Sequence, residues 1–278
     1  MNEINVESEH IDISGLYDLH IHTSPDVRPR ELDDFDAARQ AFEAGMAGIG
    51  LKSHVTSTAA RAVNIHKLFP DINVVGGIVL NEQVGGINPA AVESALSMGA
   101  KIVWMPTISA KNHRIFHGFS DGIFLQSNDK FQLPLVLEQI AKSNAVLATG
   151  HISLGEITIL VKMAVEIGIT KIVVTHPEVP WISMPLEMQK ELAKLGVFFE
   201  RCFVSTLEVG GGVPVERIIN DIKAVGVETT IISTDYGVKG CGTPVNGLRL
   251  FISRLIEAGF HLKDIKKMAG DNPGFLIQ

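Results

Sequence analysis

Short apolar runs recur along the whole chain, and each is followed by a turn and then by a segment with helical periodicity. The runs are rich in Val and Ile and show little polar alternation, which is typical of strands buried on both faces of a parallel sheet. We count eight of them, at residues 16–21, 47–52, 73–80, 101–106, 145–150, 171–176, 197–203 and 229–235.

The segments between the runs carry helix start and stop signals. Asn88 precedes Pro89 in a cap-then-proline order, and Ser153 precedes Glu156 with the spacing of a capping box. Gly168 closes the segment that Ser153 opens. Eight strand–helix units in roughly 250 residues predict a (β/α)₈ TIM barrel of the α/β class. An open doubly wound sheet is the alternative, but neither a Gly-rich dinucleotide fingerprint nor a Walker loop supports it.

One connection is longer than the others. Residues 107–133 follow the fourth run and exceed an ordinary strand-to-helix loop. We expect them to contain a small hairpin that turns at Ser127-Asn128-Asp129 and to form a lid over the mouth of the barrel. No linker or low-complexity tract divides the chain, so residues 1–278 are expected to form one domain.

Composition narrows the function classes. Hydrophobic residues make up 46% of the chain, which is enough for a full core, and the net charge of -7 disfavours a nucleic-acid surface. No stretch approaches the ~18 apolar residues of a membrane span, and the polar N-terminus lacks a signal core. Two cysteines fit a reduced, cytoplasmic setting. A chain this apolar often self-associates, so a homo-oligomer is expected as an alternative to a monomer.

Ionisable residues close most of the apolar runs. In a parallel barrel the catalytic groups come from these carboxyl ends, so the residues there are the candidates for chemistry. Seven of the ten histidines fall at such ends or in the long connection. The candidates are His20, His22, Lys52, His54, Glu82, His151, His176, Glu200, Arg201 and Asp235, with Lys111, His113 and His117 in the connection. A ring of imidazoles and carboxylates predicts a metal site.

The spacing of His20 and His22 has a physical reason. Side chains two residues apart on a strand point to the same face, so both imidazoles can meet one cation while Ile21 packs outward. Asp18 is expected to orient one of them or to pair with a neighbour. Asp235 can both bind a metal and accept a proton from water, whose pKa a divalent cation lowers from ~15.7 towards ~7.

Together these motifs resemble the amidohydrolase superfamily of metal-dependent hydrolases. The matching motifs are LHIH (His20, His22), TGH (His151), THP (His176) and STD (Asp235), each at the end of the expected strand. The closing segment MAGDNPGFLI is also similar to the last helix of that family. The resemblance implies that His20, His22 and His176 hold a metal, that Asp235 binds it and transfers protons, and that His151 completes the metal shell or polarises the substrate.

Two features depart from that pattern. Binuclear members carry a carbamylated lysine at the end of strand four, whereas Lys101 lies at the wrong end and Lys52 lies on strand two. Lys52 is therefore expected to contact a substrate anion or act as an electrophile, and otherwise to form a salt bridge. His54 at the end of the second run and Glu82 at the end of the third are similar to a histidine and a glutamate of the PHP phosphoesterases. This resemblance implies a second cation. One or two ions per chain are expected, zinc first, with Mn, Fe or Ni as alternatives.

Each candidate also has a purely structural interpretation. Asp235 could cap the next helix, His151 could be a loop histidine, Glu200 and Arg201 could pair with each other, and His113 and His117 could be solvated. The favoured function is hydrolysis of a small-molecule amide, cyclic amide or ester. The alternatives are a decarboxylase or lyase, a phosphoesterase, and a non-catalytic metal-binding barrel.

Overall fold

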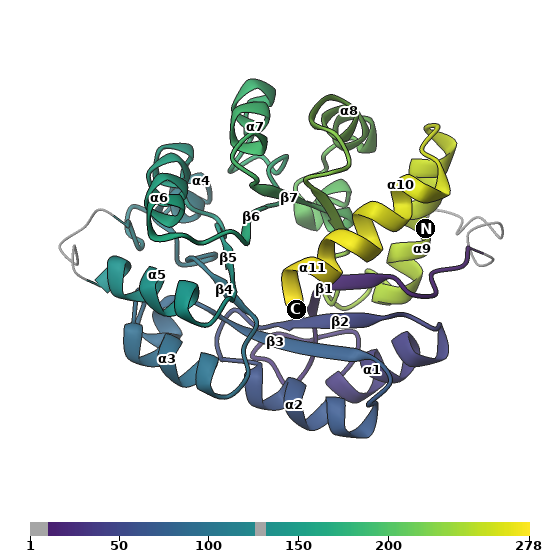
Figure 1. Ribbon diagram of the computed structural model, residues 1–278, viewed down its shortest axis with the longest axis horizontal. Coiled ribbons are helices and arrows are strands. Elements are labelled where there is room, and N and C mark those ends of the chain that lie inside the picture. The colour runs from purple at the N-terminus through teal and green to yellow at the C-terminus, as the bar shows by residue number, and fades with distance from the viewer. Residues whose placement is uncertain (1–10, 126–131) are drawn as a thin grey trace.

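Eight parallel strands pair with their neighbours in sequence order in a computed structural model, which describes residues 11–125 and 132–278. The strands lie at the centre of the molecule and the helices surround them (Figure 1). The predicted (β/α)₈ barrel is therefore confirmed. Seven strands lie within their predicted runs, and β1 extends one residue beyond its run. The strands are β1 Tyr17–His22, β2 Gly48–Lys52, β3 Asn73–Val79, β4 Ile102–Trp104, β5 Val146–Ala148, β6 Ile172–Thr175, β7 Phe198–Cys202 and β8 Thr230–Ser233.

The first and last strands meet through backbone hydrogen bonds just beyond β8. The Asp235 N–H donates to the His20 carbonyl at 2.8 Å, and the His22 N–H donates to the Tyr236 carbonyl at 2.7 Å. The Asp18 carboxylate accepts from the backbone and the hydroxyl of Thr234. Asp18 thus links β1 to the segment after β8, and it pairs with a neighbouring residue, which is one of the two roles predicted for it.

Helices follow the strands and cover the outside of the barrel. The Ser153–Glu156 capping box and the Asn88 cap are both present, and Gly168 ends its helix with a left-handed φ of 92°, as predicted. The helices are α1 Asp34–Glu43, α2 Ala59–Leu68, α3 Pro89–Ser97, α4 Lys111–Phe116, α5 Gln132–Lys142, α6 Leu154–Ile167, α7 Leu186–Ala193, α8 Val215–Val225, α9 Pro244–Glu257, α10 Leu262–Lys266 and α11 Asn272–Ile277. None of the helices in the described ranges has the length and hydropathy needed to cross a bilayer.

The core has two parts, one between the strands and the helices and one inside the barrel. Ile21 is fully buried in the outer part, as its position between two histidines predicts. Inside the barrel, Trp104 packs with other strand residues and with Leu276 and Ile277 of α11. Asn272 fixes α11 by donating to two carbonyls beside β8. One end of the barrel is therefore filled with apolar side chains, which leaves the other end for polar chemistry.

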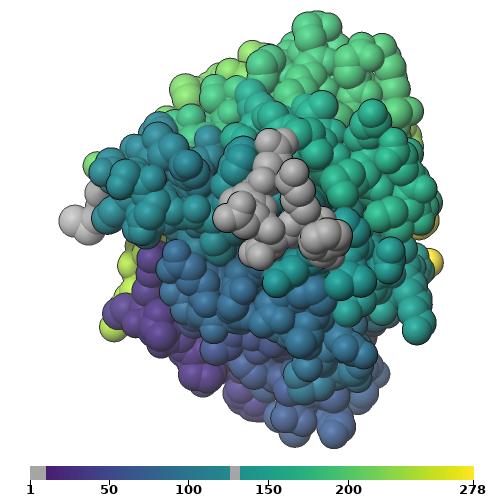
Figure 2. All heavy atoms as spheres, turned by 90° about the vertical axis from the view of Figure 1, so that its left-hand side faces the viewer, coloured from purple at the N-terminus to yellow at the C-terminus, as the bar shows by residue number. Residues whose placement is uncertain are grey.

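The long connection after β4 contains the short helix α4. Its backbone turns back on itself, because the Lys111 N–H donates to the Ile123 carbonyl and the Ile123 N–H donates to that of Ser109. Figure 2, which faces the left-hand side of Figure 1, shows this connection on the same face of the molecule as α5 and α6. The hairpin turn predicted at residues 127–129 lies outside the described residues, and the lid role remains a prediction.

Candidate metal centre

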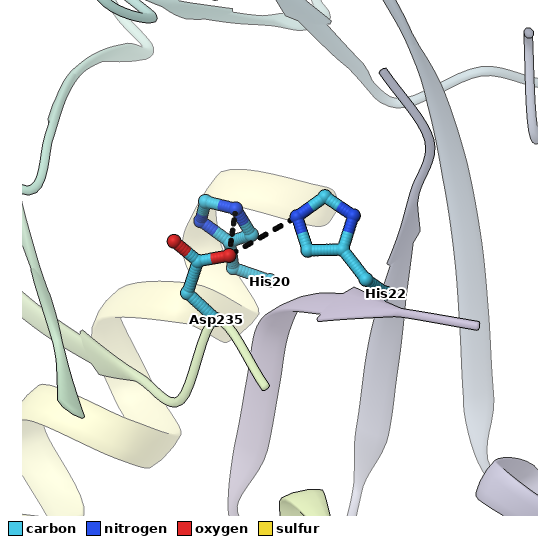
Figure 3. Close-up of side chains that lie close together, drawn as sticks. All are labelled: His20, His22 and Asp235. Atoms are coloured by element: carbon cyan, nitrogen blue, oxygen red, sulfur yellow. Dashed lines mark ion pairs between the residues drawn. The ribbon is translucent and has the colours of Figure 1, made fainter. Parts of the chain in front are cut away.

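Two imidazoles of β1 converge on a single carboxylate oxygen from the end of β8. Asp235 Oδ1 lies 3.0 Å from His20 Nε2 and 3.1 Å from His22 Nε2 (Figure 3). The three candidate ligand atoms all lie within 4.8 Å of one another. Two imidazole nitrogens and one carboxylate oxygen at this spacing suit a divalent cation, and three protein ligands leave a coordination position open. The residues therefore fit the metal that the sequence predicts.

Glu200 of β7 holds His20 from the opposite side. Its Oε2 accepts from His20 Nδ1 at 3.0 Å, and its Oε1 accepts from the Ser233 hydroxyl at 3.0 Å. A carboxylate on the far nitrogen fixes the tautomer and orientation of a metal-binding histidine. This role was missed at the sequence level. The available signal was that Glu200 is an acid at an inward-facing position of a buried strand.

Arg201 does not pair with Glu200, so the proposed ion pair between these neighbours is wrong. Adjacent strand residues point to opposite faces, and Arg201 points out of the barrel. It donates to the carboxylate of Glu178 and, at 2.8 Å, to Gln189 Oε1. All of these side chains are buried.

Five imidazoles form a closed circuit around the barrel mouth. The ring centroids are separated by 5.5 Å for His20–His22, 4.7 Å for His22–His54 and 6.4 Å for His54–His151. The circuit continues over 4.8 Å from His151 to His176 and closes over 6.3 Å back to His20. The strand-end histidines thus share one site, although His151 and His176 contact each other at 3.1 Å between their Nε2 atoms rather than Asp235. Their ligand roles remain predictions.

Most of these imidazoles are neutral, which is the form that binds metals. Burial lowers the pKa of His22 and of His176 to about 4 and moves the pKa values of His54 and His151 well below the usual range. Burial also lowers the pKa of His20, but the nearby carboxylates outweigh it and raise that pKa to about 9.

Asp235 is held as a carboxylate. Its burial favours the protonated form, but the charge and hydrogen bond of His20 and the contact with His22 outweigh burial and hold the pKa of Asp235 well below its usual range. The bonds that it makes to two imidazoles explain why capping the next helix is not its role. That cap is Thr243, whose hydroxyl accepts from Asn246 N.

The backbone is left-handed at three positions around the site. Asp235 has a φ of 55° and His176 a φ of 31°, which are strained values for residues with a side chain. Gly150 has a φ of 59°, and a Cβ there would lie 2.4 Å from the Met105 carbonyl oxygen. The sharp turn that only glycine permits at this position places His151 at the strand end.

Lys52 is buried beside the same histidine. Its Nζ lies 2.8 Å from His20 Nε2 and 5.3 Å from the centre of the Trp104 ring, and the residue is 1% exposed. Burial lowers the pKa of Lys52. It forms no salt bridge among the described residues, so the salt-bridge alternative is not what the structure shows.

The structure places Glu82 away from this group. It is exposed, begins the short helix Glu82–Val84, and lines a different cavity with residues 121–125. Its neighbour Asn81 turns inward instead and donates to the His54 carbonyl and the Thr107 hydroxyl. Because β3 ends at Val79, alternation no longer determines which side chain faces the mouth. The second-metal set of His54 with Glu82 is therefore not assembled.

A cavity of about 630 Å³ opens above the site. His113 of α4 reaches into it and lies 3.0 Å from His151 between their Nδ1 atoms, so it is not simply a solvated loop histidine. His117 and Trp181 also line the cavity, together with Arg28, Arg30 and Arg114. The arginines were not predicted as site residues; Arg28 and Arg30 lie in the loop that follows β1.

A family model matches residues 15–200 of the chain, and it describes a family of unknown function, DUF6282. The chain belongs to this family. The matched segment contains every strand-end histidine of the circuit and ends at Glu200, whereas Asp235 lies beyond it. A comparison with curated proteins found no match.

Solved structures are similar to this chain over nearly its whole length. An amidohydrolase from Pseudomonas aeruginosa is 14% identical, with a TM-score of 0.63 over 95% of each chain. A phosphotriesterase homology protein from Escherichia coli, complexed with phosphate in its active site, is 14% identical with a TM-score of 0.63 over 96% of this chain and 100% of that one. A 2,6-dihydroxybenzoate decarboxylase is 13% identical, with a TM-score of 0.57 over 95% of this chain and 99% of that one. At these identities the comparisons show a shared fold, and the fold implied by the amidohydrolase resemblance is confirmed.

Proposed function

We propose that the protein is a metal-dependent hydrolase that cleaves a small amide, cyclic amide or ester. The observation that carries the proposal is the convergence of His20 Nε2 and His22 Nε2 on Asp235 Oδ1 at 3.0 and 3.1 Å. The Glu200 carboxylate behind His20 and the neutral imidazoles around it support a site built to hold a cation.

The residues divide the chemistry between them. A divalent cation held by His20, His22 and Asp235 would polarise the scissile carbonyl and make a water acidic enough to attack it at neutral pH. Asp235 accepts a proton from the attacking water while the water oxygen forms a bond to the carbonyl carbon. Asp235 then returns that proton to the departing nitrogen or oxygen when the bond to carbon breaks. His151 lines the cavity beside His176 and is proposed to hold the carbonyl oxygen of the substrate.

We propose one cation per chain, with zinc as the first choice for a site of imidazoles and one carboxylate. A phosphoesterase with two or three cations loses support because Glu82 lies outside the site. Decarboxylation remains the second candidate. It is favoured by the cationic residues of the cavity, which suit a carboxylate substrate, and the structural neighbours include a decarboxylase.

Metal analysis followed by a panel of amides, cyclic amides and esters tests the proposal. Purified protein should contain about one divalent cation per chain, with zinc expected first, and at least one substrate should be hydrolysed. Asp235→Asn should lose about 10²-fold or more of the rate, the usual contribution of general acid–base catalysis. Asp71→Asn, an exposed aspartate outside the site, is the matched control. Protein without bound metal, or an unimpaired Asp235→Asn, would contradict the proposal.

A further inference from the structure

The charged residues of the cavity are predominantly basic. Arg28, Arg30, Lys52 and Arg114 line it, against the single carboxylate of Asp235. A volume of about 630 Å³ is in the usual range for sites that bind small molecules. The cation that the site is built to hold would add further positive charge, so the cavity should favour an anion.

Two of the three arginines lack a full set of partners. Arg114 is satisfied by Asp121, which accepts at 2.6 Å and at 3.0 Å. Arg30 donates through Nη2 to Asp26 at 3.0 Å, but its buried Nε has no hydrogen-bond partner among the described residues, and its side chain is only 4% exposed. Arg28 is exposed and forms no ion pair within the described part of the chain, so its guanidinium is open to a ligand that enters the cavity. A buried guanidinium donor normally finds an acceptor, and a carboxylate matches its planar fork.

The charges of Arg28 and Arg30 reach ionisable side chains that line the same cavity. Burial is the main reason why the pKa values of Lys52 and His54 are lowered, and the charge of Arg30 lowers both further. The charge of Arg28 likewise adds to the effect of burial in lowering the pKa of His113 to about 4. Arg28 and Arg30 line the same cavity as His22 and Asp235, so an anion bound to them lies in the cavity that holds the reacting centre.

Part of the cavity wall is aromatic. The Trp181 ring lies 5.2 Å from the ring of His113, 5.8 Å from that of His117 and 5.6 Å from that of His151, between centroids. Trp181 Nε1 is buried and has no hydrogen-bond partner among the described residues. Buried indole N–H groups usually have an acceptor, so this wall offers flat surfaces and one unused donor.

We propose that the substrate is a planar ring compound bearing a carboxylate, which binds Arg28 and Arg30 while its ring packs among His113, His117 and Trp181. The proposal rests on the proposed function for the place of the reaction and adds the substrate class. The carboxylate accepts from the free guanidinium donors, the ring fills the aromatic wall, and the Trp181 N–H donates to a polar substituent of the ring.

Binding of three matched probes to the zinc-loaded protein, measured by titration calorimetry, tests the substrate class without requiring turnover. Benzoate carries both features, benzamide lacks the charge, and cyclohexanecarboxylate lacks the planar ring. Benzoate should bind about tenfold or more tightly than benzamide, because a charge-assisted hydrogen bond is worth ~1.5–3 kcal/mol and ~1.4 kcal/mol is tenfold. It should also bind several-fold more tightly than cyclohexanecarboxylate.

Substitutions separate the arginines from the metal as the anion-binding group. Arg28→Gln should weaken benzoate about tenfold and leave benzamide unchanged, whereas Arg39→Gln, on the exposed face of α1, should change neither. Unchanged benzoate affinity in Arg28→Gln, equal affinity for all three probes, or no benzoate binding at millimolar concentration would overturn the proposal. If benzoate binds as expected while no amide or ester is hydrolysed, the hydrolase assignment fails and the substrate class stands.

Discussion

Glu200 binds His20 on the side opposite to Asp235, with 3.0 Å between Glu200 Oε2 and His20 Nδ1. The His20 ring is thereby fixed between two carboxylates, and its Nε2 is directed at the proposed cation. Burial favours protonation of Glu200, but the charge of His20 outweighs it and lowers the pKa of Glu200. The carboxylate is therefore charged and increases the basicity of the imidazole.

Replacing Glu200 should weaken metal binding without changing the ligands themselves. Glu200→Gln removes the negative charge behind His20, and we expect a loss of about 10–100-fold in zinc affinity, the usual effect of removing such a partner. Competition with a chromophoric chelator measures it. Glu166→Gln, an exposed position on α6, is the control. Equal zinc affinity in Glu200→Gln and wild type would show that Glu200 serves only packing.

Lys52→Met should strengthen metal binding. The Lys52 amine lies 2.8 Å from His20 Nε2, the same nitrogen that is proposed to hold the metal ion. A positive charge on Lys52 repels a metal ion bound there. Methionine keeps the buried apolar stem beside Trp104 and removes the charge. The same chelator competition measures the change, which we expect to be several-fold. A lower zinc affinity in the variant would mean that Lys52 helps to hold the metal.

Zinc should stabilise the folded protein against heat. A ligand that binds only the native state adds about 2.7 kcal/mol at 100 times its Kd, and each kcal/mol raises the Tm by about 2–4 °C in domains of 150–250 residues. We therefore expect an increase of at least about 5 °C in differential scanning calorimetry, reversed by a chelator. The shift should vanish in His22→Ala, which lacks one ligand. An equal shift in that variant would place the zinc elsewhere.

The buried pair of Arg201 and Glu178 should matter for stability rather than for metal binding. Arg201→Met leaves the Glu178 carboxylate buried without its cation, which should lower the free energy of unfolding by about 3–5 kcal/mol in urea titrations. Adding Glu178→Gln to this variant should recover most of the loss. Arg254→Met, which breaks an exposed pair on α9, should change it by less than about 1 kcal/mol. Equal losses in Arg201→Met and Arg254→Met would contradict this account.

The barrel could be predicted from the sequence because its determinants are local. Buried parallel strands need continuous apolar runs, and Asn88 and Ser153 are followed by the residues that their caps require. The Ile21 position between two histidines fixes which face enters the barrel. None of these inferences needs knowledge of distant contacts.

The site could be predicted only in part, because its geometry depends on residues far apart in the chain. The strand-end rule gathers His20, His22 and Asp235 correctly. It fails at Glu82, where the chain has already left the strand and Asn81 takes the inward position. It gives no partner for Glu200, because the contact with His20 spans 180 positions along the chain. The free donors of Arg28 and Arg30 depend on loop packing that carries no periodic signal.

The contacts of Asp235 with the two histidines of β1 have a consequence for how the molecule matures. The ligands come from opposite ends of the chain, so they can meet only after the eighth strand has docked against the first. A nascent chain that stops before β8 would hold the imidazoles but not the carboxylate. Ion uptake would thus come last in folding, and a site-specific metal signal would report that synthesis and closure are complete.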